Sequence, residues 1–412
     1  MAQFYENQAE QEKVILVAVY EKGGFQDEES LRELEELTKT AGAVCVGTVT
    51  QNLESENPVT YLGKGKLEEL RTMLVAYDAT GIVCDMELTP VQMKNLSQIL
   101  DTKIMDRTMI ILDIFAARAN TREGKIQVEL AQLKYNATML VGLRPSLSRL
   151  GGGIGTRGPG EKKLEMDRRL IREQISRLKR DLEQVKQHRA TQRKQRSTSS
   201  SPVVCIVGYT NAGKSTLLNH LTQADVLEED KLFATLDPTT RALQLPNGQN
   251  IMLTDTVGFI SKLPHHLIQA FRSTLEEAKY SDLILHVVDA SNPEMDRQMY
   301  AVYDTLRQLD IADKSVITVF NKIDKLDDMP VLKDLRADAT VTISAKQEKG
   351  LDALLDTIGT QLRQQQIYVE RVISYKDTAK LSNIRKYGQL LSEEYREDGI
   401  HIKAYVRKQE DI

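Results

Sequence analysis

The chain has 412 residues, of which 41% are hydrophobic and 28% are charged, and its formal net charge is −4. This length allows two or three domains with separate cores, and the composition is ordinary for a soluble globular protein. The first residues lack a basic-then-apolar run, and no apolar stretch approaches the roughly 20 residues of a membrane span. We therefore expect no secretory signal, no integral membrane segment and a cytoplasmic location.

Charge is unevenly distributed along the chain. Residues 142–196 contain 16 Lys and Arg against 6 Asp and Glu, whereas residues 203–363 contain 16 against 23. A basic block beside an acidic domain indicates a polyanionic partner. The three cysteines, Cys45, Cys84 and Cys205, each lie beside valines in strand-like runs, which predicts reduced, buried thiols.

Residues 13–106 alternate short apolar runs with segments of helical periodicity. The pattern predicts an N-terminal α/β domain with a largely parallel sheet. The expected strands are residues 14–20, 43–49, 81–85 and 103–106. Tyr61 to Lys66, with the sequence YLGKGK, precedes the second expected helix. Its glycines suit either a helix entry, which we favour, or an anion-binding turn.

A long helical hairpin is expected next. Residues 107–141 are mostly helical, and the polar segment 120–124 predicts two helices or one with a break. Residues 161–196 carry an apolar seam of 3-4 spacing with one break, Arg168, which should pack on the earlier helix. The segment holds 13 basic residues, Arg168 included, which suit either a polyanion or a solvated surface. Residues 197–202 are typical of a linker.

The loop of the hairpin, residues 149–160, is rich in glycine. Six glycines fall between Gly151 and Gly160, with Arg149 and Arg157 close by. Such a segment forms neither helix nor strand, and its bare backbone suits close approach to a phosphate surface. A flexible linker explains the composition equally well, although the serine-rich filler of a linker is absent here.

Residues 208–215, GYTNAGKS, match the phosphate-loop pattern GxxxxGK[ST] between a strand-like run and a helix-like one. In this setting backbone N–H groups surround a β-phosphate, Lys214 reaches the β and γ oxygens, and the Ser215 hydroxyl holds Mg²⁺. The loop alone does not distinguish an ATP-binding site from a GTP-binding site.

Three later loops predict guanine. Strand-like runs and helical segments between residues 203 and 365 predict a doubly wound sheet with ligand loops at the strand ends. Asp255 to Gly258 (DTVG) can support Mg²⁺ and sense a γ-phosphate, and Asn321 to Asp324 (NKID) places a carboxylate that accepts the N1 and N2 hydrogens of guanine. Ser344 to Lys346 (SAK) can offer a backbone N–H to guanine O6.

The complete fold class that we expect is α/β: an N-terminal α/β domain with a long helical hairpin, a central doubly wound P-loop GTPase domain and a small C-terminal α/β appendage. The tail predicts a hairpin turn at Asp398-Gly399. The expected boundaries are 1–141 for the N-terminal domain, 142–201 for the glycine-rich loop, helix and linker, 202–365 for the GTPase domain and 366–412 for the appendage.

The chain resembles the HflX family, ribosome-associated GTPases of the Obg–HflX branch. Tyr61 to Lys66 resembles that family's GKGK element, Arg149 to Arg169 its GGxGxRGPGE…LExDRR signature, and Phe233 to Arg241 its first switch. The resemblance implies GTP hydrolysis, binding to the large ribosomal subunit and its RNA, and dissociation of stalled or idle 70S ribosomes under stress. We expect a monomer off the ribosome.

Residue roles follow from these motifs and from the resemblance. The catalytic set is Lys214, Thr235, Asp255 and Gly258, and the Mg²⁺ ligands are Ser215 and Thr235, with Thr239 as the alternative to Thr235. The GTP contacts are Gly208, Tyr209, Thr210, Asn211, Ala212, Gly213, Lys214, Ser215, Phe233, Thr235, Asp237, Asp255, Thr256, Gly258, Asn321, Lys322, Asp324, Ser344, Ala345 and Lys346. The RNA-contact candidates are Arg144, Arg149, Arg157, Lys162, Lys163, Arg168 and Arg169.

Two residues suggest how turnover is controlled. Phe259 follows Gly258 where many signalling GTPases place a glutamine that orients water, so we expect slow hydrolysis until the ribosome completes the site. Asn211 either helps to bind K⁺ beside the phosphates or satisfies the loop backbone. Two other functions stay open: a GTPase that assists assembly of the large subunit, and a nucleotide-gated scaffold for a protein or membrane partner.

Overall fold

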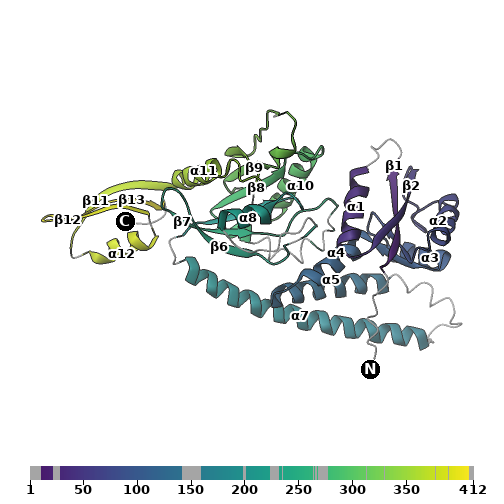
Figure 1. Ribbon diagram of the computed structural model, residues 1–412. Coiled ribbons are helices and arrows are strands. Elements are labelled where there is room, and N and C mark those ends of the chain that lie inside the picture. Colours follow the sequence, from purple (N-terminus) through teal and green to yellow (C-terminus); the bar gives the residue numbers. More distant parts are fainter. Residues whose placement is uncertain are drawn as a thin grey trace, which may run out of the picture. The chain divides into compact units, whose positions relative to one another are not determined.

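The computed structural model describes residues 11–21, 28–141, 159–197, 201–222, 232–233, 235–262, 264, 267, 277–311, 313–328, 330–375, 377–387 and 389–407. The chain forms two compact units (Figure 1). The N-terminal unit comprises Met1–Leu182 and Ser261–Ala270, and the C-terminal unit comprises Glu183–Ile260 and Phe271–Ile412. Within the described ranges no helix is long and apolar enough to cross a membrane.

The N-terminal unit is built on a four-stranded sheet in the order β2-β1-β3-β4. All three neighbouring pairs are parallel, as the alternation of strand-like and helix-like segments predicts. Parallel strands require crossover helices, which cover both faces of such a sheet. The strands are β1 (Lys13–Glu21), β2 (Val44–Leu53), β3 (Gly81–Cys84) and β4 (Lys103–Asp106).

Three crossover helices connect these strands: α1 (Glu28–Thr40), α2 (Lys64–Ala76) and α3 (Pro90–Leu100). The YLGKGK segment is the entry to α2, and Gly63 donates its N–H to Gln51 Oε1 at 2.9 Å. Helix α3 begins with a capping box in which Thr89 and Gln92 satisfy each other's backbone N–H groups. Leucines of α2 and α3 share one buried cluster with Ile15, Val17 and Ile82 of the sheet.

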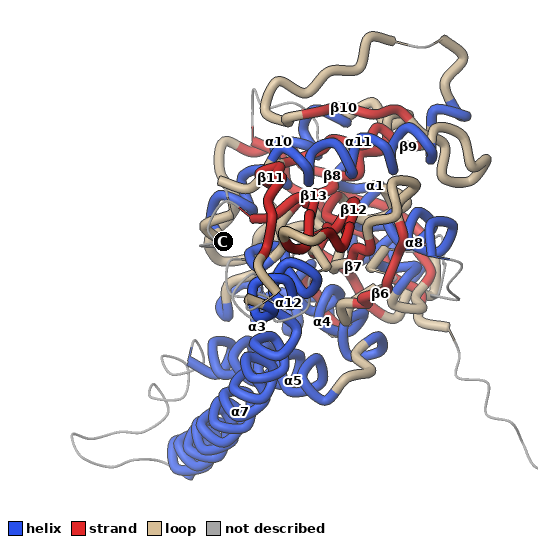
Figure 2. Tube along the Cα trace, turned by 90° about the vertical axis from the view of Figure 1, so that its left-hand side faces the viewer, coloured by secondary structure: helices blue, strands red, loops and turns tan. Residues whose placement is uncertain are grey.

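Residues 107–141 form two helices, α4 (Arg107–Arg118) and α5 (Arg122–Val141), which is the first of the two predicted alternatives. Helix α7 (Pro159–Ser197) follows, and its part in the N-terminal unit lies beside α5 in both views (Figures 1 and 2). Three apolar residues of the 3-4 spaced seam predicted within residues 161–196, Ile171, Ile175 and Leu178, are half-buried. Arg168, the break in the seam, donates from Nη2 to the carbonyl of Leu140 at 2.6 Å and so satisfies a carbonyl of the last turn of α5.

The C-terminal unit contains a six-stranded sheet in the order β10-β9-β8-β5-β7-β6. Every neighbouring pair is parallel except β6 with β7. The strands are β5 (Val203–Gly208), β6 (Thr239–Gln244), β7 (Asn250–Asp255), β8 (Leu283–Asp289), β9 (Val316–Asn321) and β10 (Ala339–Thr342). All six lie between residues 203 and 365, where the sequence predicts a doubly wound sheet.

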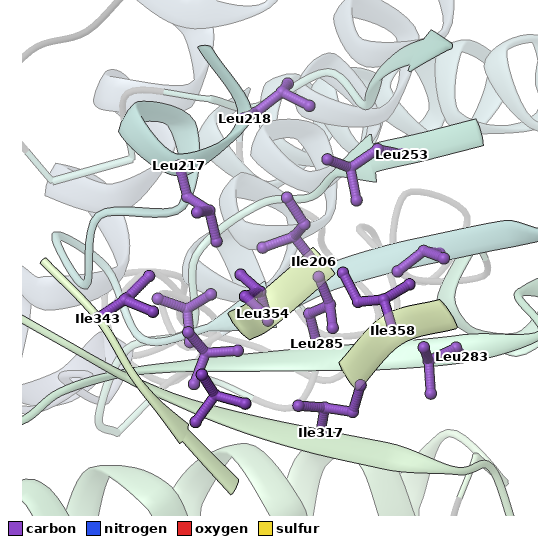
Figure 3. Close-up of a cluster of buried hydrophobic side chains, with 14 of the residues drawn as sticks. Ile206, Leu217, Leu218, Leu253, Leu283, Leu285, Ile317, Ile343, Leu354 and Ile358 are labelled. Atoms are coloured by element: carbon purple, nitrogen blue, oxygen red, sulfur yellow. The ribbon is translucent and has the colours of Figure 1, made fainter. Parts of the chain in front are cut away.

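Helices cover both faces of this sheet. Leu217 and Leu218 of α8 (Lys214–Thr222), and Leu354 and Ile358 of α11 (Leu351–Gln364), form the core on one face (Figure 3). On the other face, Met299 of α10 (Met295–Gln308) joins a smaller cluster with Val288 and Phe320. The carboxyl ends of the parallel strands therefore form one polar edge between these layers.

The tail forms a three-stranded antiparallel sheet, β11-β13-β12, with one helix. Its elements are β11 (Gln366–Ile373), α12 (Thr378–Tyr387), β12 (Gln389–Arg396) and β13 (Gly399–Arg407). The β12–β13 pairing confirms the hairpin turn predicted at Asp398-Gly399.

One expectation is wrong. Cys84 and Cys205 are buried free thiols, but Cys45 is only half-buried, because β2 is an edge strand of its sheet. A valine-rich run predicts a strand but does not tell whether that strand is central. The glycine-rich loop lies almost entirely outside the described residues.

Candidate functional site

The phosphate loop connects β5 to α8, as its sequence context predicts. Gly213 has φ +93°, and a Cβ there would lie 2.3 Å from Nδ2 of Asn321. Neither the backbone angle nor the space admits a side chain, so this position requires glycine. The glycine lets the end of the loop approach the residue that begins the NKID segment.

Lys214 is the first residue of α8, and its side chain is buried. Its Nζ donates to the carbonyl of Tyr209 at 2.7 Å. Burial lowers the pKa of Lys214 to about 8, and the nearby Asp255 carboxylate opposes this shift. The ammonium group is buried and its hydrogen-bond acceptor is a neutral carbonyl. An anion is therefore a better acceptor for it than that carbonyl.

Three side-chain oxygens, from Ser215, Thr235 and Asp255, lie close together at the start of α8. Ser215 Oγ donates to Asp255 Oδ2 at 2.9 Å and lies 2.9 Å from Thr235 Oγ1. Asp255 is fully buried, and within the described part of the chain its Oδ1 has no hydrogen-bond partner. Burial raises the pKa of Asp255, while Lys214 and Ser215 lower it. Hard oxygen donors with one spare carboxylate oxygen fit Mg²⁺.

The two threonines that compete for the metal role occupy different places. Thr235 lies in the loop that reaches Ser215, whereas Thr239 is the first residue of β6 and pairs with Asp255 across the sheet. The hydroxyl contact to Ser215 is therefore made by Thr235.

The DTVG segment lies directly against the phosphate loop. Thr210 N donates to Phe259 O at 2.7 Å, and Phe259 N donates to Gly208 O at 3.1 Å. A Cβ on Gly258 would lie 2.9 Å from Thr210 Cα and 3.0 Å from Lys214 Nζ. Phe259 is buried, with 3% exposure, and does not line the cavity described below. The backbone of Gly258, which carries no side chain, thus lies next to Lys214.

The other end of the site is built around Asn321. Its Nδ2 donates to Ala212 O at 2.9 Å, and its Oδ1 accepts the N–H of Ala345 at 2.9 Å, so one side chain joins the phosphate loop to the SAK loop. Ser344 Oγ donates to Asp324 Oδ1, and this bond lowers the pKa of Asp324. Asp324 is therefore an oriented, ionised carboxylate.

These segments enclose a cavity of about 390 Å³. Most of the predicted nucleotide contacts line it: Thr210, Asn211, Gly213, Lys214, Ser215, Phe233, Thr235, Thr256, Gly258, Asn321, Lys322, Asp324, Ala345 and Lys346. The other predicted contacts, Gly208, Tyr209, Ala212, Asp237, Asp255 and Ser344, do not line it. Thr216 and Lys325 line the cavity without having been predicted, and each directly follows a motif residue, which is the signal that could have found them.

The RNA-contact candidates are described only in part. Arg144, Arg149 and Arg157 lie outside the described residues, as do the side chains of Lys162 and Lys163. Arg168 bonds to Leu140, and the exposed Arg169 pairs with Glu173 at 2.9 Å. Further along α7, five basic side chains are exposed that the sequence did not single out: Arg172, Arg177, Lys179, Arg180 and Lys186.

Comparison with known proteins assigns most of the chain to one family of GTPases. Three family models match: GTP-binding GTPase N-terminal over residues 28–116, GTP-binding GTPase Middle Region over 118–196, and 50S ribosome-binding GTPase over 203–322. A "GTPase HflX" of Lacrimispora saccharolytica is 65% identical over 406 residues, covering 98% of this chain and 96% of that protein. A "GTPase HflX" of Caldanaerobacter subterraneus subsp. tengcongensis is 50% identical over 397 residues, covering 96% and 91%.

The chain is also similar to a solved structure. The GDP complex of a GTP-binding protein from Sulfolobus solfataricus is 25% identical, with a TM-score of 0.46, and the match covers 85% of this chain and 99% of that one.

Proposed function

Because this chain belongs to the HflX family of GTPases and hydrolyses GTP, we propose that it acts on the large ribosomal subunit and dissociates stalled or idle 70S ribosomes. The observation that carries the proposal is a nucleotide site joined in one chain to a basic α7. The description of the matching family model, 50S ribosome-binding GTPase, supports the same partner.

In this proposal the cavity holds GTP along its length. Asp324, ionised and oriented by Ser344, accepts the N1 and N2 hydrogens of guanine. Because the N–H of Ala345 donates to Asn321, the N–H of Lys346 is the one that the SAK loop offers to O6. Lys214 exchanges its bond to Tyr209 O for the β and γ phosphate oxygens. This exchange places an anion beside the buried ammonium group of Lys214. It therefore offsets the desolvation cost that lowers the pKa of Lys214.

Ser215 and Thr235 are proposed to hold Mg²⁺ directly, and Asp255 to support it through water. Bound there, Mg²⁺ neutralises charge on the β and γ phosphates. The orphaned Oδ1 of Asp255 and the spacing of the two hydroxyls support this choice of ligands.

The catalytic group that orients water is proposed to come from the ribosome. Phe259 cannot polarise water, and its backbone is bonded to the phosphate loop on both sides. Completing such a site accelerates turnover by about 10³–10⁵-fold in reference GTPases. We therefore expect slow GTP hydrolysis by the protein alone and fast hydrolysis when it is bound to large subunits.

The exposed basic residues of α7 are proposed to contact ribosomal RNA. Lys134 of α5 and Lys179 of α7 are close enough for the charge of Lys179 to lower the pKa of Lys134, after the larger effect of burial. Like charges that face each other across a helical hairpin favour a polyanionic partner that neutralises both.

The test measures GTP turnover by purified protein with large subunits, small subunits or neither. We expect stimulation by large subunits of at least about 100-fold, and conversion of 70S particles to subunits on sucrose gradients with GTP. Equal turnover with and without large subunits would refute the proposal.

The same preparations separate the alternatives. An assembly GTPase would associate with large-subunit precursors in extracts rather than with mature 70S particles. A scaffold would associate with its partner independently of salt, whereas RNA binding weakens by roughly one log unit per log salt for each phosphate contact. A K⁺ role of Asn211, which has φ +58°, predicts faster turnover in K⁺ than in Na⁺.

A further inference from the structure

An ion pair joins the ends of two neighbouring strands of the C-terminal unit. Asp289 is the last residue of β8, and it is paired in the parallel register with Asn321, the last residue of β9. Lys322 follows Asn321, and its Nζ lies 2.7 Å from Asp289 Oδ2. The side chain of Asp289 is 15% exposed and that of Lys322 is 18% exposed. The pair is therefore shielded from most of the solvent that weakens ion pairs on protein surfaces.

The carboxylate of Asp289 is held in place by its own loop. Its Oδ1 accepts the backbone N–H of Ser291 at 3.0 Å and the hydroxyl of Ser291 at 2.6 Å, and its Oδ2 contacts Lys322. The backbones of the two strand ends are also joined, because the N–H of Ala290 donates to the carbonyl of Asn321 at 2.9 Å. The acceptor for the ammonium group is therefore oriented by bonds that do not involve Lys322.

Lys322 is constrained at its backbone as well as at its ammonium group. It has φ +64°, which non-glycine residues adopt rarely and only where neighbouring contacts maintain it. Its carbonyl accepts the N–H of Lys325 at 3.0 Å, which closes the short turn that carries Asp324. Because both ends of the side chain are fixed, the flexible carbon stem between them retains few of its conformations.

Lys322 lines the nucleotide cavity, whereas Asp289 does not. In sequence Lys322 stands between Asn321 and Asp324, at the end of the cavity assigned to the base. The charge of Asp289 therefore reaches a bound nucleotide through Lys322. The effect of Lys322 at the phosphate end is small: burial is the largest cause of the lowered pKa of Lys214, Asp255 opposes it, and Lys322 adds the smallest contribution.

We propose that Asp289 is a positioning residue for guanine nucleotides, which holds the side chain of Lys322 at the cavity wall before the nucleotide binds. The proposal rests on the GTP site proposed above. A lysine that is already ordered loses little conformational freedom when the base enters, whereas a free lysine must be ordered on binding. Because this effect acts at the base end, it is the same for GDP and GTP and does not enter the chemical step.

The test compares full-length Asp289→Asn with the wild type in equilibrium binding of GDP and of a non-hydrolysable GTP analogue. The amide keeps an acceptor for Ser291 but turns a donor toward the ammonium group of Lys322, which releases that side chain. We expect both affinities to fall by the same factor of about five, the cost of ordering one flexible side chain. The single-turnover rate of hydrolysis at saturating GTP should not change. The matched control is Asp304→Asn, which breaks the exposed ion pair with Arg307 on α10, away from the cavity lining, and should alter neither measurement.

A double-variant cycle tests whether Asp289 acts through Lys322. Lys322→Met keeps an unbranched stem without the ammonium group, and in that background Asp289→Asn should cause no further loss of GDP affinity. An equal further loss there, a larger loss for the GTP analogue than for GDP, unchanged or tighter binding in Asp289→Asn, or a parallel fall in the single-turnover rate would each overturn the proposal. Asp324→Asn tests the contact to the base itself, so failure of the proposed nucleotide site is distinguishable from failure of this positioning role.

Discussion

Replacing Asp324 by Asn tests the assignment of the base most directly. The carboxylate offers two acceptor oxygens, and its bond from Ser344 keeps it oriented and lowers its pKa. Guanine presents two donors, N1–H and N2–H, to such a group. An amide keeps one acceptor but turns a donor toward one of these hydrogens, so the variant loses one hydrogen bond and gains a repulsive contact.

The expected loss follows from the strength of charge-assisted hydrogen bonds. Each is worth about 1.5–3 kcal/mol, and the half-exposed position of Asp324 favours the lower value for the one bond that is lost. The repulsive contact that replaces it, together with the lost charge on the remaining bond, adds about as much again. A total of about 3 kcal/mol corresponds to roughly 150-fold weaker GDP binding. Xanthine carries an oxygen in place of the N2 amine, and the side-chain amide of Asp324→Asn can donate to that oxygen. The variant should therefore bind xanthosine diphosphate more tightly than GDP.

The assay is equilibrium binding of fluorescent GDP and fluorescent xanthosine diphosphate to wild type and variant. Asp328→Asn is the control, because it makes the same chemical change at an exposed position nearby that does not line the cavity. A loss of GDP affinity below about fivefold, or no gain for xanthosine diphosphate, would refute the proposed contact.

Three further changes probe other parts of the molecule. Gly258→Ala places a Cβ 2.9 Å from Thr210 Cα, so hydrolysis should fall about 100-fold while GDP binding, measured by fluorescence, changes little. Thr235→Ala should raise the Mg²⁺ concentration needed for half-maximal turnover about tenfold and Thr239→Ala should not; the reverse order would exchange their roles. Burial lowers the pKa of His286 to about 4, below its ordinary 6.5, so the stability it contributes is present above pH 6.5 and is lost as pH falls toward about 4. Between pH 7 and 5 this amounts to about 2 kcal/mol, which His286→Phe should abolish in urea unfolding followed by circular dichroism; an equally steep pH dependence in the variant would contradict it.

Local sequence was sufficient to predict most of the residues that line the cavity, because they lie within short segments at strand ends. GxxxxGKS, DTVG, NKID and SAK each combine backbone geometry with one or two side chains, and parallel strands bring such ends together without long-range information. The six strands of the C-terminal sheet follow from the same regularity. The half-buried Cys45 shows the limit, since whether β2 lies at an edge depends on strand order.

Contacts between distant segments could not be predicted in this way. Arg168 was the break in an otherwise apolar seam, and only the position of Leu140 explains it as a helix-ending donor. A buried ion pair of the N-terminal unit is the clearer case, because Arg107 Nη1 donates to Asp85 Oδ1 at 2.7 Å although neither residue belongs to a motif. In sequence each is an ordinary polar residue beside a strand or loop.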